Sequence, residues 1–123
     1  MEETFVIMRD DGHLLPHKSF GLPRRFVLIA VKAKDLAEAT EHALSECESG
    51  LSLGSVSLRV ASRQLPQDKK AGEYILEMQK AYGGGFYGNH KPQPSDNYAG
   101  LVFADKERDT ARRLIADQKC YID

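Results

Sequence analysis

The chain has 123 residues, of which 41% are hydrophobic and 28% are charged. This length suits a single α+β domain over residues 1–123, with a core that needs no metal or disulfide to support it. A formal net charge of −1 argues against general attraction to nucleic acid or anionic membranes, and the longest apolar run, residues 26–31, is far too short for a membrane span.

The cysteines and the start of the chain bear on location. Cys47 and Cys120 lie far apart in the chain and lack CxxC spacing, which is typical of reduced cysteines inside the cell. The acidic start, residues 1–4, has no basic region of the kind that opens a signal peptide. We therefore expect a cytoplasmic protein that needs no cofactor and no metal.

The N-terminal segment predicts a β-hairpin. Residues 4–9 form a strand pattern, and Asp10-Asp11-Gly12 is a turn signal because glycine adopts positive φ at little cost. Residues 13–15 are the expected return strand. Residues 16–25 contain two prolines and a glycine, so they are expected to form a loop.

A strand and a helix follow. Residues 25–33 contain an apolar run without alternation, which predicts a central strand covered on both faces. Asp35 and Glu38 resemble a capping box at the start of a helix over residues 35–48. Residues 55–63 then alternate between apolar and polar side chains, which is typical of a half-exposed edge strand.

A third helix pattern begins at Pro66 and ends before three glycines at residues 83–85. Residues 83–97 are expected to form the longest irregular stretch, because they are rich in glycine and proline. A second strand-helix-strand pattern follows, with a strand at 98–104, a helix at 105–118 and a strand at 119–122.

The order of these elements predicts the fold. Four strands and the helices at 35–48 and 105–118 follow the order β-α-β-β-α-β of a ferredoxin-like split β-α-β. The N-terminal hairpin and a helix-plus-loop insertion, residues 66–97, are then additions. Strands 25–33 and 98–104 should be adjacent, antiparallel and central. The alternative is an open three-layer α/β sheet, in which helix 66–82 is a crossover.

The central strands also predict how the sheet is covered. They are apolar on both faces, whereas a ferredoxin-like sheet carries helices on one face only. We expect helix 66–82, the N-terminal hairpin or a second copy of the chain to cover the other face, because a bare one would be a large apolar patch.

The glycine-rich stretch predicts a surface for a protein partner. Exposed aromatic side chains on such a loop can anchor a partner, although they can equally fold back over the sheet. The loop leaves a helix instead of entering one, which argues against phosphate binding. We expect a small non-enzymatic accessory protein that binds a protein partner or a second copy of itself. Its predicted contact residues are Phe86, Tyr87, His90 and Tyr98.

The first alternative is an RNA- or nucleoprotein-binding domain. Basic side chains along one edge strand can contact phosphates, but they also serve to prevent edge-to-edge pairing of sheets. The residues concerned are Arg24, Arg25, Arg59, Arg63, Lys69 and Lys70.

The second alternative is a small-molecule binder or a small enzyme that uses His13, His17 and His90. No cysteine or carboxylate completes a familiar metal-ligand spacing with these histidines, and no nucleophile motif is present. The sequence therefore predicts neither a catalytic residue nor a metal ligand.

Overall fold

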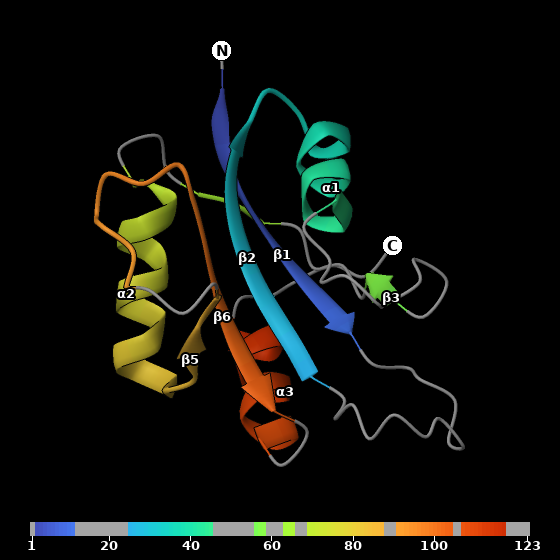
Figure 1. Ribbon diagram of the computed structural model, residues 1–123, viewed down its shortest axis with the longest axis vertical. Coiled ribbons are helices and arrows are strands. Elements are labelled where there is room, and N and C mark those ends of the chain that lie inside the picture. Colours follow the sequence, from blue (N-terminus) through green and yellow to red (C-terminus); the bar gives the residue numbers. More distant parts are fainter. Residues whose placement is uncertain are drawn as a thin grey trace.

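A computed structural model describes residues 2–11, 25–45, 56–58, 63–65, 69–87, 91–104 and 107–117. The described strands form one antiparallel sheet in the order β3-β1-β2-β6-β5, and β4 pairs with β1 on the same side as β3 (Figure 1). The strands are β1 Glu3–Asp11, β2 Arg25–Ala33, β3 Val56–Leu58, β4 Arg63–Gln64, β5 Gly85–Phe86 and β6 Tyr98–Ala104. The helices are α1 Leu36–Ser45, α2 Ala71–Tyr82 and α3 Arg108–Asp117.

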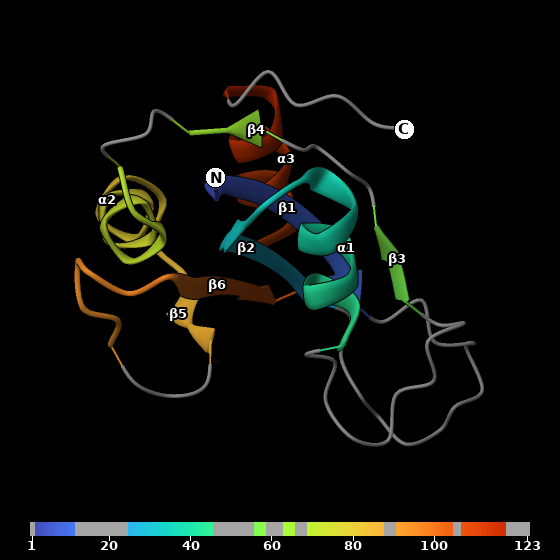
Figure 2. The ribbon, with the colours of Figure 1, turned by 90° about the horizontal axis from the view of Figure 1, so that it is seen from above.

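The sheet is the middle of three layers. Figure 2 shows α1 on one side of it and α2 and α3 on the other. Successive side chains of a strand point to opposite faces, so each central strand contributes to two separate cores. The α1 core contains Phe5, Ile7, Val27, Ile29, Val31, Ala33, Ala39 and Ala43. The α2/α3 core includes Val6, Met8, Leu28, Tyr74, Ile75, Leu101, Phe103 and Leu114.

The expectation for residues 25–33 is confirmed. Strand β2 spans these residues, lies between β1 and β6, and is buried on both faces from Phe26 to Val31. Burial of each large aliphatic side chain stabilises the fold by about 1.5–3 kcal/mol. The continuous apolar run is therefore explained by two helical layers that cover one strand.

The expected contact between residues 25–33 and 98–104 is also confirmed, because β2 and β6 pair antiparallel from Arg25 opposite Ala104 to Val31 opposite Tyr98. The additional cover over the sheet comes from α2, the helix expected between the second and third core strands. Together with α3 it packs on the face away from α1.

The ferredoxin-like strand order is not confirmed. That order needs the strand pattern at 55–63 on the far side of β6, but β3 and β4 both pair with β1. A split β-α-β unit does form, since β2 and β3 run parallel with β1 between them and α1 connects them. The expected strand at 119–122 lies outside the described residues. The result is an α+β fold with three layers, as in the predicted alternative, but with an antiparallel sheet.

The expected N-terminal hairpin is wrong in its pairing. Strand β1 continues through Asp10 and Asp11, where a turn was expected, and pairs with β2 over nine residue pairs. The expected return strand at 13–15 lies outside the described residues. Pairing with β2 places β1 between the α1 core and the α2/α3 core, which bury its two faces, whereas a short isolated hairpin would leave them exposed.

The start of α1 is fixed by hydrogen bonds between neighbouring residues, and the start of α2 by a segment far along the chain. At α1, the Glu38 amide donates to Asp35 Oδ1 at 2.9 Å and the Lys34 amide donates to Glu38 Oε2 at 2.7 Å, which confirms the capping box. Helix α2 begins at Ala71, later than the Pro66 expected, because Lys70 is extended and the Gly72 amide donates to the Asp96 carbonyl. A distant segment thus caps α2.

Candidate functional site

A cluster of half-buried side chains lies where the C-terminal turn of α1 meets β6. We call it the α1–β6 surface, and it consists of His42, Tyr87, Tyr98 and Val102. In Figure 2, α1 lies over β1 and β2, and no described helix lies over the same face of β6. The side chains on this face of β6 consequently keep part of their area exposed, in contrast to those of β2.

The strand period places the residues of β6 on this face. Tyr98, Gly100 and Val102 alternate with Ala99, Leu101 and Phe103, which belong to the α2/α3 core. Glycine at position 100 lets Tyr87 lie directly against the strand, because a Cβ atom there would stand 3.1 Å from the Cβ atom of Tyr87. The Tyr87 ring therefore covers β6 where no described helix does.

The rings of the surface contact one another. His42 and Tyr98 have ring centroids 4.6 Å apart with their planes tilted by 32°, and Tyr87 meets Tyr98 nearly edge-on at 6.5 Å. Such tilted and edge-to-face arrangements are the favoured geometries of aromatic pairs. Two tyrosines and a histidine from three separate segments are thereby held as one unit.

A buried arginine lies next to this unit. The side chain of Arg9 on β1 is fully buried, and its guanidinium lies 5.6 Å from the centroid of the Tyr87 ring. Its Nη1 atom donates to the carbonyl of Ala43 at 2.6 Å. The last carbonyls of a helix lack intrahelical partners and carry partial negative charge, so a cation is favoured there. Arg9 thus connects α1, the sheet and Tyr87.

Sequence reasoning did not identify Arg9. The available signal was its position, because Phe5, Ile7 and Arg9 alternate onto one face of the first strand pattern. A charged residue in line with two large apolar ones is unusual on a buried face. His42 was not predicted as a contact residue either, because it packs on Tyr98, which lies far along the chain.

The four predicted partner-binding residues are not brought together as one set. Tyr87 and Tyr98 lie on the α1–β6 surface, whereas Phe86 is half-buried and packs on the α2/α3 core. Both aromatic side chains of the glycine-rich stretch fold back against the sheet, on opposite faces. His90 lies outside the described residues.

The six basic residues of the nucleic-acid alternative are not gathered by the described part of the fold. Arg24 and Arg59 lie outside it. Arg25 and Arg63 pair with positions of β1 that lie five residues, or about 17 Å, apart at the strand rise of roughly 3.4 Å per residue. Lys69 forms an ion pair with Glu77 at 2.6 Å, and Lys70 is exposed at the start of α2.

The histidine alternative falls outside the described residues altogether, because His13, His17 and His90 are not among them. Within the ranges that the structure describes, no three His, Cys, Asp or Glu side chains are grouped closely enough to hold a metal ion. None of the described helices is long and apolar enough to cross a membrane.

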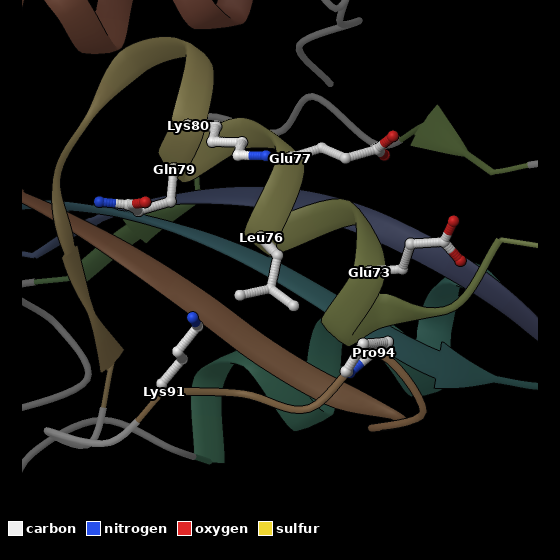
Figure 3. Close-up of a pocket in the computed structure, with 7 residues that line it drawn as sticks. All are labelled: Glu73, Leu76, Glu77, Gln79, Lys80, Lys91 and Pro94. Carbon is white, nitrogen blue, oxygen red and sulfur yellow. The ribbon is translucent and has the colours of Figure 1, made fainter.

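A shallow groove of about 370 Å³ lies on the outer side of α2, on the opposite side of the sheet from α1. Figure 3 shows Leu76 reaching into it from the helix and Lys91 from the segment that precedes β6. The groove has charges of both signs, and one of its carboxylates, that of Glu77, already pairs with Lys69. Its lining consists of Glu73, Leu76, Glu77, Gln79, Lys80, Lys91 and Pro94.

The chain was compared with protein-family models, curated proteins and solved structures, and no significant match was found in any of the three comparisons.

Proposed function

We propose that this chain is a small non-enzymatic binding protein that contacts a protein partner through the α1–β6 surface. The observation that carries the proposal is the half-buried, partly exposed aromatic cluster of His42, Tyr87 and Tyr98 on a face of β6 that no described helix covers. Tyrosine is enriched in the centres of protein interfaces, where a few aromatic anchors supply most of the binding energy.

The rigid support beneath the cluster favours this role. Tyr87 lies against Gly100 on one side and near the Arg9 guanidinium on another, and the His42 ring packs on Tyr98. Side chains that are already ordered lose little rotamer freedom when a partner binds. The surface can therefore present a large contact area at a small entropic cost.

The proposed binding partner of the α1–β6 surface is a different protein, and the competing possibility is a second copy of the chain. Strands β1 and β2 already have helical cover on both faces within one chain, so self-association is not needed to bury them. A cytoplasmic location stays part of the proposal.

The test is a binding measurement with matched variants. A partner recovered by co-purification should bind Tyr98→Ala and His42→Ala at least about tenfold more weakly than the wild type, a loss of roughly 1.4 kcal/mol. The control is Leu76→Ala, which removes a half-exposed apolar side chain from the groove on the other side of the sheet. Thermal melting of each variant separates lost binding from lost folding.

Equal binding by wild type, Tyr98→Ala and His42→Ala would rule the surface out. Analytical ultracentrifugation distinguishes a different protein from a second copy of the chain as the partner. A dimer that Tyr98→Ala converts to a monomer would identify the second copy as the partner, and the proposal of a different protein would then be wrong.

A further inference from the structure

The exposed surface of α1 next to the aromatic cluster is acidic. Asp35, Glu38 and Glu41 are all exposed. Glu38 lies one helical turn before His42, so the two side chains lie on the same side of α1, the side that meets Tyr98. The α1–β6 surface therefore has aromatic rings at its centre and the Glu38 carboxylate at its border, and Glu41 lies on the adjoining exposed side of α1.

The rings themselves already accept a cation. The guanidinium of Arg9 lies 5.6 Å from the centroid of Tyr87, within the distance at which the negative face of an aromatic ring attracts a positive charge. Tyr98 lies beside this ring and beside His42. Aromatic rings next to carboxylates are the chemistry that recognises lysine and arginine side chains, since both groups favour a cation.

We propose that the partner presents a basic segment to this surface, with lysine or arginine side chains set among apolar ones. The inference rests on the proposed function and specifies the class of partner. The apolar residues would pack on Tyr87, Tyr98 and Val102, and the cations would pair with Glu38 and Glu41. Charge complementarity of this kind raises the association rate and rejects acidic competitors.

Two peptides and two double variants of the protein test the partner class. One peptide is a short segment of lysine, leucine and glycine, and the other has each lysine replaced by glutamate. Binding is measured by NMR titration of the isotope-labelled protein. The lysine peptide should bind at least about tenfold more tightly than the glutamate peptide, a difference of roughly 1.4 kcal/mol. It should shift the amide resonances of His42, Tyr87 and Tyr98.

The variant Glu38→Gln/Glu41→Gln removes two charges, and the amide oxygen introduced at position 38 can still accept the Lys34 amide. It should weaken binding of the lysine peptide by about fivefold or more, in line with the loss of two charge pairs. The matched control is Glu73→Gln/Glu77→Gln, which removes two charges from α2 on the other side of the sheet and should leave that affinity unchanged.

Equal affinity for the two peptides, or equal weakening by the two double variants, would overturn the inference. Failure of the inference is distinguishable from failure of the proposed function. If the recovered partner is lost with Tyr98→Ala but still binds Glu38→Gln/Glu41→Gln normally, the surface is correct and the basic partner class is wrong. If the recovered partner binds Tyr98→Ala and Glu38→Gln/Glu41→Gln as tightly as the wild type, the proposed surface and the proposed partner class are both wrong.

Discussion

Arg9 is a charged residue in the interior, and its burial has to be offset by contacts. Removal of a guanidinium from water is costly unless it is hydrogen-bonded. In this chain its Nη1 atom donates to the Ala43 carbonyl and its guanidinium lies near the Tyr87 ring. Arg9 therefore holds the end of α1 and one of the proposed contact residues in a fixed relation.

We expect Arg9→Ala to lower the free energy of unfolding by roughly 2–4 kcal/mol, because it removes a charged hydrogen bond and leaves a buried carbonyl without its donor. Arg9→Met should cost less, since it keeps an apolar stem of similar length without a charge to bury. Urea unfolding of the two variants and the wild type measures both effects. The same midpoint for Arg9→Ala and wild type would contradict this account of Arg9.

The start of α2 depends on a glycine, and this can be tested with one substitution at two positions. A Cβ atom at Gly72 would stand 1.9 Å from the Gln93 carbonyl oxygen, whereas one at Gly85 would meet nothing within 4 Å. Gly72 has to remain small because the turn at residues 93–96 packs directly on the helix and accepts the Gly72 amide.

Gly72→Ala should therefore destabilise the protein by about 1–3 kcal/mol through overpacking, although alanine is normally the better helix former. Gly85→Ala should leave stability unchanged or raise it by up to about 1 kcal/mol, because alanine restricts the unfolded chain. Thermal melting of the two variants checks the prediction. Only Gly72→Ala is expected to destabilise the protein, and an equal loss of stability in both variants would show that the close contact at Gly72 is not the cause.

At the scale of the whole molecule, one sheet is shared by two cores. Strands β1 and β2 place alternate side chains in each core, so neither helical layer can separate without exposing the strands that support the other. We expect a single cooperative unfolding transition, as small domains usually show.

Ile29→Ala in the α1 core and Leu114→Ala in the α2/α3 core should each lower the free energy of unfolding by about 2–5 kcal/mol. Both should shift the same transition, followed by circular dichroism and by tyrosine fluorescence. Two separate transitions in either variant would show that the layers unfold independently.

Local patterns in the sequence were sufficient to identify most of the elements. The apolar runs identified β2 and β6, helical spacing identified α1, α2 and α3, and Gly83 marked the end of α2. The capping box at Asp35 and Glu38 could also be predicted from the sequence, because its hydrogen bonds join residues only three or four positions apart. Burial of β2 on both faces followed from its lack of alternation, whereas β6 keeps Tyr98 and Val102 partly exposed on one face.

Tertiary structure alone decided where these elements go. β1 was expected in a separate hairpin but pairs with β2, and α1 covers the opposite face from α2 and α3. Pairing between strands far apart in sequence depends on the total area that each arrangement buries, which no local pattern reports. The α1–β6 surface has the same origin. Residues 9, 42, 87 and 98 meet only because the sheet brings β1 and β6 to either side of β2 and α1 packs across it.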